Sequence, residues 1–264
     1  MSVPTGLWKV EGAGNDFVLG SGKAAGRLFA KPGFIPRLCD RHRGVGADGV
    51  LLVERLDRER LALIYHNADG SRARFCGNGT RCAAHAAHHL FDVEARHVVR
   101  TDWTDITAEV LSHGVSLLMP GPTEIRQVEL ECDGQVWSGQ QLTLGVEHLL
   151  VEVESVSAVD LPAIAPRLRY HPDLGPGGAN VSFLATAVHG AREIRTWEMG
   201  VERETLCCGS AVAAAGWFTA VSRGADSSTL RARSGDLLSV EPNGDLLKLT
   251  GPARLVAEVR LLEV

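Results

Sequence analysis

The sequence lacks a long apolar run, an excess of positive charge and a recognisable export signal. Its longest mostly apolar stretch, Ala211 to Val221, is too short to span a bilayer. The 27 Lys and Arg against 32 Asp and Glu give a formal net charge of −5, so we expect no binding to nucleic acid. The chain begins MSVPTGLWKVEG, without a basic segment followed by an apolar one. We therefore predict a cytoplasmic protein that contacts neither nucleic acid nor membrane.

The chain is also poor in cysteine for a protein stabilised by disulfides. It has six cysteines, which are scattered: Cys39, Cys76, Cys82, Cys132, Cys207 and Cys208. This distribution favours a reducing compartment, where an unusual cysteine is more often catalytic or metal-binding than structural. We expect four of the six to be small buried apolar residues.

What the chain does have is ordinary globular composition, with 45% hydrophobic and 22% charged residues, and a length suited to one large or two small domains. The spacing of apolar residues predicts helices at two Ala-rich segments, 77–91 and 209–222, and each segment begins at a Cys-Gly pair. Short runs rich in Val, Leu, Ile and Thr predict strands at 50–54, 61–65, 98–101, 115–119, 141–144, 149–153, 180–184 and 193–197.

The two Cys-Gly segments indicate an internal repeat. Cys76 and Cys208 are separated by half the length of the 264-residue chain. The stretch CGNGTRCAAHAA in the first half is similar to CGSAVAAAGWFT in the second. The pattern predicts two pseudo-symmetric α/β (α+β) domains, each a sheet wrapped around one central helix. The segment MPGPT, Met119–Thr123, is the expected linker.

Two other motifs are weaker. Gly44 to Gly49 fits the dinucleotide pattern G-x-G-x-x-G, but no apolar strand precedes it and no helix follows, so we expect a loop leading into a strand. Cys82, His85 and His89 share one stripe of the first predicted helix, which allows zinc as an alternative. No further ligand cluster is evident, and we predict no metal site.

The Cys-Gly helix starts suggest acid–base chemistry. The positive end of a helix dipole favours a thiolate, and the first N–H groups of a helix bind carboxylates. Two such ends facing each other would place an α-carbon between a thiolate and a thiol, an arrangement that inverts a stereocentre without a cofactor.

Five blocks of the sequence resemble the motifs of the diaminopimelate epimerase family, in the family's order. They are KVEGAGNDFV, RGVGADGVLLV, HNADGSRARFCGNGTRC, GGANVSF and WEMGVERETLCCGSAVAAAG. The resemblance covers essentially the whole chain. It implies the family's fold, with mixed, mainly antiparallel sheets in a first domain of residues 1–118 and 255–264 and a second of residues 119–254.

The resemblance also implies roles for individual residues. Cys76 and Cys208 are the paired catalytic base and acid, while Glu198 and His148 handle the α-amino group and assist proton transfer. The substrate contacts implied are Asn15, Asn67, Gly77, Asn78, Asn180, Glu198, Met199, Gly209 and Ser210. Neither pyridoxal phosphate nor a metal is implied. A homodimer is implied, together with an amino-acid substrate and a place in lysine biosynthesis and D-amino-acid metabolism.

Two departures from the family's pattern fall in the region that binds the far end of diaminopimelate. Val146-Glu147-His148 stands where the family usually has Asn-Pro-His, and Met199 stands where it usually has Arg. The missing guanidinium would have formed a strong contact with a carboxylate. Either Arg203 replaces it, or the substrate lacks a distal carboxylate, and Glu147 then favours a basic amino acid such as histidine, lysine or ornithine.

A protein of another class also fits the altered pocket, namely one that binds an amino acid without catalysis. The two cysteines discriminate between these hypotheses, because only an enzyme requires both of them.

Overall fold

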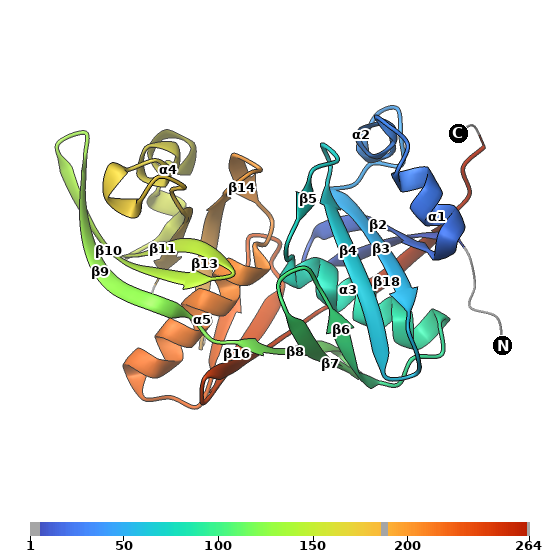
Figure 1. Ribbon diagram of the computed structural model, residues 1–264. Helices are drawn as coiled ribbons and strands as arrows, with labels where there is room; N and C mark the ends of the chain where they lie inside the picture. Colours follow the sequence, from blue (N-terminus) through green and yellow to red (C-terminus); the bar gives the residue numbers. More distant parts are fainter. Residues whose placement is uncertain (1–5, 186–189, 263–264) are drawn as a thin grey trace. The chain divides into compact units, whose positions relative to one another are not determined.

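The computed structural model describes residues 6–185 and 190–262. These residues divide into two compact units (Figure 1): unit 1 runs up to Leu118 and resumes at Thr250, and unit 2 is Met119–Leu249. The sequence placed the return to the first domain at Leu255, five residues later than this division. The earlier return has a packing reason. The Ser116 and Thr250 hydroxyls are 2.6 Å apart, and Gly114 lies so close to Gly251 that a Cβ would be 2.4 Å from its carbonyl oxygen.

Unit 1 is a mixed sheet around one central helix. Its strands are β1 (Leu7–Gly12), β2 (Asn15–Ser21), β3 (Gly49–Arg55), β4 (Arg60–Asn67), β5 (Arg72–Ala73), β6 (Arg96–Arg100), β7 (Asp105–Leu111), β8 (Gly114–Pro120) and β18 (Arg254–Val259). They pair in the order β18–β1–β2–β3–β4–β6–β7–β8, and short β5 pairs with the end of β4. The β2–β3 and β4–β6 pairs are parallel, whereas the others are antiparallel.

Helix α3 (Gly77–Leu90) occupies the middle of unit 1, and it contacts β1, β2, β3, β4, β6, β7 and β18. Ala83, Ala84, Ala86 and Ala87 are fully buried, because small side chains let strands approach the helix from several sides. Helices α1 (Gly22–Phe29) and α2 (Phe34–Cys39) pack their apolar residues on another part of the sheet, around Val18 and Val50.

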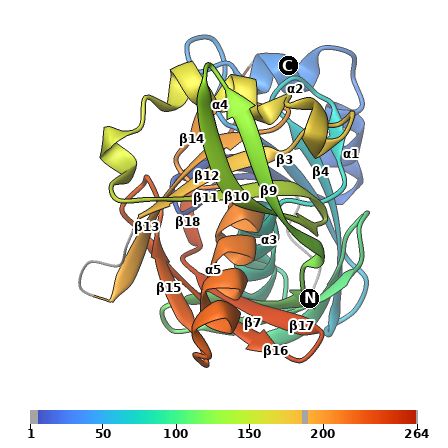
Figure 2. The same ribbon diagram turned by 90° about the vertical axis from the view of Figure 1, so that its left-hand side faces the viewer.

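Unit 2 repeats this arrangement (Figure 2). Its strands are β9 (Thr123–Cys132), β10 (Gln135–Leu144), β11 (Val146–Val153), β12 (Asn180–Ala185), β13 (Ala191–Glu198), β14 (Arg203–Thr205), β15 (Ser228–Arg231), β16 (Leu237–Asn243) and β17 (Leu246–Gly251). They pair as β9–β10–β11–β12–β13–β15–β16, with short β14 against the end of β13. The parallel pairs, β11–β12 and β13–β15, stand in the same places as in unit 1.

The central helix of unit 2 is α5 (Gly209–Arg223), which contacts β10, β11, β12, β15 and β16. It packs so closely that a Cβ on Gly216 would lie 2.4 Å from a methyl carbon of Val240. The other face of the sheet is covered by η1 (Val156–Ala158), α4 (Leu161–Arg169) and η2 (Pro172–Leu174) over a core that includes Leu149, Val181 and Phe183.

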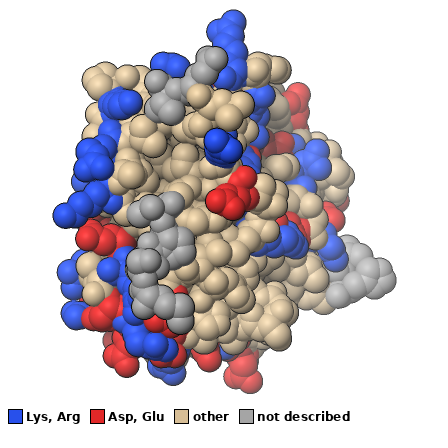
Figure 3. Space-filling view, turned by 90° about the vertical axis from the view of Figure 1, so that its right-hand side faces the viewer, with Lys and Arg blue, Asp and Glu red and all other residues tan. Residues whose placement is uncertain are grey.

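The mixed fold class expected from the sequence is confirmed, and the two predicted helices are α3 and α5. The G-x-G-x-x-G segment is a loop whose last glycine begins β3, as predicted. Of the helices that the structure describes, none combines the length and apolar character that a bilayer crossing requires. On the face drawn in Figure 3, Lys and Arg lie among Asp and Glu, with uncharged residues between them.

Candidate active site

Three polar residues gather at one edge of the sheet in unit 1. Asn15 begins β2, Asp48 immediately precedes β3, and Asn67 ends β4. The register pairs Phe17 with Gly49 and Gly49 with Asn67, which brings these strand ends side by side. The Asn67 side chain donates to the Ser71 hydroxyl at 3.0 Å and thereby closes the turn that leads into β5.

Cys76 follows β5 and is the N-cap of α3. Its sulfur accepts a hydrogen bond from the Gly79 N–H at 3.4 Å, and its carbonyl accepts one from the Thr80 N–H at 2.8 Å. A side chain on Gly79 would lie 2.9 Å from a Leu51 methyl group, so glycine allows the helix start to approach β3. Cys76 is half-buried, and Gly77 and Asn78 form the first turn of the helix beside it.

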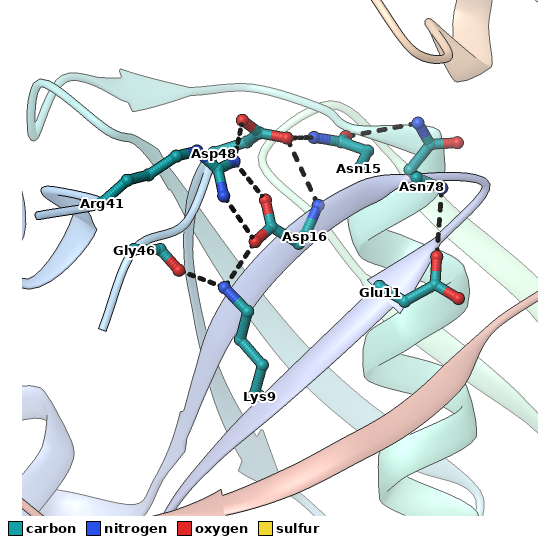
Figure 4. A network of polar contacts seen from close by, with 9 residues as sticks. Lys9, Glu11, Asn15, Asp16, Arg41, Gly46, Asp48 and Asn78 are labelled. Carbon is teal, nitrogen blue, oxygen red and sulfur yellow. Dashed lines mark hydrogen bonds and ion pairs between the residues drawn. The ribbon is translucent and has the colours of Figure 1, made fainter. Parts of the chain in front are cut away.

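The Asn15 side chain links Cys76 to a charged network, and Figure 4 shows the part of it that includes Asn15, Asn78, Asp48, Arg41 and Asp16. Its Oδ1 is 3.9 Å from the Cys76 sulfur and accepts from Asn78 Nδ2 at 3.2 Å, while its Nδ2 donates to Asp48 Oδ2 at 2.8 Å. Arg41 then joins Asp48 to Asp16, at 2.8 and 2.6 Å. Burial by itself would raise the pKa of Asp16, but hydrogen bonds from Arg41 and Lys9 lower it.

Unit 2 has a corresponding edge. His148 on β11 pairs with Asn180 at the start of β12, and Val181 pairs with Trp197, so that Asn180 stands across from Glu198. Residues paired in this way lie on the same face of a sheet. His148, Asn180 and Glu198 therefore share one face. Asn180 Oδ1 accepts from the Met199 N–H at 2.7 Å, and Glu198 Oε2 accepts from the Thr205 hydroxyl at 2.8 Å.

Cys208 is the N-cap of α5, directly before Gly209 and Ser210. The helix dipole predicts a lowered pKa for both thiols, but for Cys208 the net shift is in the opposite direction. Burial raises the pKa of Cys208 well above its ordinary value, and the nearby Glu198 carboxylate raises it further. Hydrogen bonds from the Ser210 hydroxyl, 3.5 Å from the sulfur, and from the Ala211 N–H offset only part of this.

His148 is completely buried, and neither ring nitrogen has a full hydrogen bond to any described residue. Burial lowers the pKa of His148 to about 4, and a weak contact with the Leu144 backbone opposes this only slightly. The imidazole is therefore neutral at pH 7 and can accept a proton or a hydrogen bond.

The structure changes the interpretation of the altered motif at 145–148. Because side chains alternate along a strand, Glu147 lies on the face opposite to His148. Its carboxylate accepts from the Thr143 hydroxyl at 2.7 Å and from Gln141 Nε2 at 3.2 Å. The expectation that Glu147 gives the substrate pocket negative charge is therefore wrong. Val146, which is on the His148 face, is 37% exposed.

Arg203, the residue considered as a replacement for the missing guanidinium, is on β14. It stands directly across from Glu198 in the β13–β14 pair, so the two side chains share a face, and it is exposed. Met199, in the turn between these strands, contributes its backbone N–H to Asn180 and no charge.

The described residues do not support the zinc alternative. His85 and His89 have ring centroids 4.4 Å apart, yet within 6–185 and 190–262 no three His, Cys, Asp or Glu side chains are grouped to hold a metal ion.

Sequence reasoning missed Asp48, Arg41 and Arg81. Asp48 and Arg81 lie inside two of the blocks that resemble the family's motifs, within GADG and TRC. Only their side-chain hydrogen bonds distinguish them from charged residues at the surface.

Comparisons with known proteins agree with this picture. The sequence model of the family described as diaminopimelate epimerase matches residues 7–125. The diaminopimelate epimerase of Hydrogenobaculum sp. (strain Y04AAS1) is 34% identical over 96% of both chains. That of Aquifex aeolicus (strain VF5) is 33% identical over 97% of this chain and 98% of its own.

Solved structures share the fold at low identity. A probable proline racemase from Agrobacterium radiobacter K84, with bound carbonate, has a TM-score of 0.72 at 18% identity, covering 98% of this chain and 94% of its own. A hydroxyproline epimerase from Agrobacterium vitis, with bound trans-4-hydroxy-L-proline, has a TM-score of 0.68 at 19% identity, covering 96% and 90%. Given its identity to curated relatives along nearly its whole length, this chain is an epimerase that works without pyridoxal phosphate and belongs to the diaminopimelate epimerase family.

Proposed function

We propose that this epimerase inverts the α-carbon of diaminopimelate, with Cys76 and Cys208 exchanging the α-proton from opposite faces. One observation carries the proposal: each of two repeated frameworks has a cysteine as the N-cap of its central helix. The names of the relatives support the substrate.

In the proposed reaction, one thiolate removes the α-proton and becomes a thiol. The opposite thiol then donates its proton to the other face of the carbanion and becomes a thiolate. The N–H groups of the helix starts at Gly77, Asn78, Gly209 and Ser210 hold the α-carboxylate, whose charge increases as the carbanion forms. No cofactor takes part in either step.

Two residues of unit 2 are proposed for the α-amino group. Glu198 provides a carboxylate for an ammonium group, and His148 provides a neutral ring that accepts a hydrogen bond. Asn15, Asn67 and Asn180 supply further amide contacts from the two sheet edges.

For the distal amino-carboxylate, we propose that Arg203 replaces the guanidinium that Met199 lacks. Its register opposite Glu198 supports this, because both side chains project from the face that carries Asn180. A second candidate substrate is an amino acid without a distal carboxylate, either basic (histidine, lysine or ornithine) or uncharged at its far end, because Glu147 faces away from His148 and selects no charge. The exposed Val146 side chain and the uncharged Met199 favour it.

The experiment is α-proton exchange in heavy water, followed by NMR with a thiol reductant present. Diaminopimelate and a panel of single amino acids are tested with wild type, Cys76→Ala and Cys208→Ala. The control is Cys207→Ala, because Cys207 is an equally buried neighbour of Cys208. We expect exchange on diaminopimelate with wild type and Cys207→Ala, and a loss of at least about 10³-fold in net inversion with either other variant.

Undiminished inversion by Cys76→Ala or Cys208→Ala would refute the two-thiol mechanism. Failure of wild type to exchange any compound would instead favour a protein that binds an amino acid without catalysis. Exchange on a basic amino acid but not on diaminopimelate would establish the second candidate.

The distal site has its own pair of variants. Arg203→Gln should raise KM for diaminopimelate by about 10- to 100-fold, because a charge-assisted contact is lost. Met199→Arg should restore part of that loss. If Arg203→Gln leaves KM unchanged, Arg203 does not bind the distal carboxylate.

The resemblance further supports a homodimer in the cytoplasm with a place in lysine biosynthesis and D-amino-acid metabolism. Light scattering on the purified protein tests the dimer, which should have twice the chain mass of 28.3 kDa.

A further inference from the structure

The hydrogen bonds behind Cys76 all run in one direction. Arg81 Nη2 donates to Asn78 Oδ1 at 2.7 Å, Asn78 Nδ2 donates to Asn15 Oδ1 at 3.2 Å, and Asn15 Nδ2 donates to Asp48 Oδ2 at 2.8 Å. The two amides thus connect a cation to a carboxylate. We call these four residues the amide relay.

The two ends of the relay fix the orientation of both amides. A guanidinium has only donors and a carboxylate has only acceptors, so Asn78 must turn its oxygen to Arg81 and Asn15 must turn its nitrogen to Asp48. The Asn15 oxygen is thereby left facing the Cys76 sulfur at 3.9 Å. Because the Asn15 N–H donates to the Asp48 carboxylate, the Asn15 amide is polarised and its oxygen becomes a stronger acceptor.

Both ends of the relay are held in place. Arg81 is fully buried on α3, and its Nε donates to the Pro252 carbonyl at 3.3 Å. Its Nη1 has no hydrogen-bond partner among the described residues, so the buried charge is costly. Asp48 is held at its other oxygen by Arg41 at 2.8 Å. An apolar residue would fill the Arg81 site without that cost, so packing alone does not require a guanidinium there.

An acceptor oxygen facing a sulfur favours the thiol over the thiolate, and at Cys76 it opposes the Gly79 N–H, which donates to the sulfur and favours the thiolate. Cys76 is half-buried, whereas Cys208 is almost fully buried, so desolvation makes Cys208 more basic than it makes Cys76. A reversible epimerase needs two bases of similar strength, because each thiol must be the base in one direction and the acid in the other.

We propose that Asp48 is a positioning residue that acts through Asn15 to raise the basicity of Cys76, and that Arg81 fixes the orientation of the Asn78 amide in the same relay. The inference rests on the proposed role of Cys76 as an acid–base group. It adds two residues that act through the Asn15 and Asn78 side chains.

The test measures the pH dependence of Cys76 alkylation by iodoacetamide without substrate, with the Cys76 peptide quantified by mass spectrometry. Asp48→Ala removes the acceptor of Asn15. The matched control is Asp16→Ala, which removes a carboxylate from the same network that accepts from Arg41 and Lys9 but makes no contact with the Asn15 side chain. Both variants lose one negative charge, so a difference between them reports the hydrogen bond.

We expect Asp48→Ala to react about three- to tenfold faster than wild type at pH 7, with its midpoint at lower pH. Asp16→Ala should move the midpoint less. The pH profile of kcat/KM should shift in the same direction in Asp48→Ala. Asp48→Asn keeps an acceptor oxygen, so it should shift the midpoint less than Asp48→Ala does. If Asp48→Ala does not fold, Asp48→Asn is tested in its place.

Equal midpoints for Asp48→Ala and Asp16→Ala would overturn the proposal. Because alkylation is measured without substrate, this outcome leaves the two-thiol mechanism intact. That mechanism is tested separately by the loss of inversion in Cys76→Ala.

Discussion

At the scale of single residues, the two cysteines share a position in the fold but differ in environment. Cys76 is half-buried with the Asn15 oxygen nearby, whereas Cys208 is buried beside Glu198, which raises the pKa of its thiol. Burial and Glu198 disfavour the thiolate at Cys208, and we propose that the Asn15 oxygen does so at Cys76. Residue type and spacing identify the pair, but the strength of each base depends on neighbours from other strands.

His148 gives a residue-scale prediction about pH. Its folded-state pKa of about 4 lies below the ordinary 6.5, so the unfolded chain binds the proton first as pH falls. Its contribution to stability is complete above pH 6.5 and is lost between pH 6.5 and 4, amounting to about 3 kcal/mol. Urea unfolding at a series of pH values measures this loss.

His148→Leu should unfold with a shallower dependence on pH over that interval. His42→Gln, at an exposed position, is the control and should keep the wild-type dependence. The same slope in all three proteins would contradict the assignment to His148.

At the scale of elements, each central helix is made of small residues where strands cross it, and α5 is apolar on nearly every side. Helix α5 lies very close to β16 at Gly216, where an added Cβ would be 2.4 Å from a methyl carbon of Val240. Gly216→Val should therefore lower the free energy of unfolding by about 1–3 kcal/mol through overpacking against β16. Urea denaturation measures it. Gly177→Ala, where a Cβ would meet no atom within 4 Å, should change stability by less than about 0.5 kcal/mol. If both variants behave alike, the contact between α5 and β16 is not tight.

The elements also show where sequence reasoning succeeds. Strong periodic signals predicted α3, α5 and eight strand segments, because their apolar residues recur with a regular spacing. Helices α1, α2 and α4 were missed. They are short, and α4 contains Pro166 within a Pro- and Arg-rich sequence. Their helical form depends on packing against a sheet, which local pattern does not encode.

At the scale of the whole molecule, the chain consists of two units with the same pairing pattern, one parallel pair on each side of the sheet centre.

The proposed mechanism needs one thiol from each unit at the same substrate carbon. Mild oxidation without substrate should then join Cys76 to Cys208, inactivate the enzyme and be reversed by thiols. Peptide mapping identifies the disulfide. Full activity with that bond formed would contradict the mechanism, and Cys207→Ala should oxidise as wild type does.

The sequence by itself determined the fold class and the family, and it singled out the two cysteines that we propose as catalytic, because these depend on composition, periodicity and motifs that are local in the chain. Tertiary structure decided which face each strand residue occupies. It turned Glu147 away from His148, set Arg203 across from Glu198, and connected Arg81 to Asp48 through two amides. These facts depend on strand register and on contacts between residues far apart in sequence, and a shift of one residue would reverse every face.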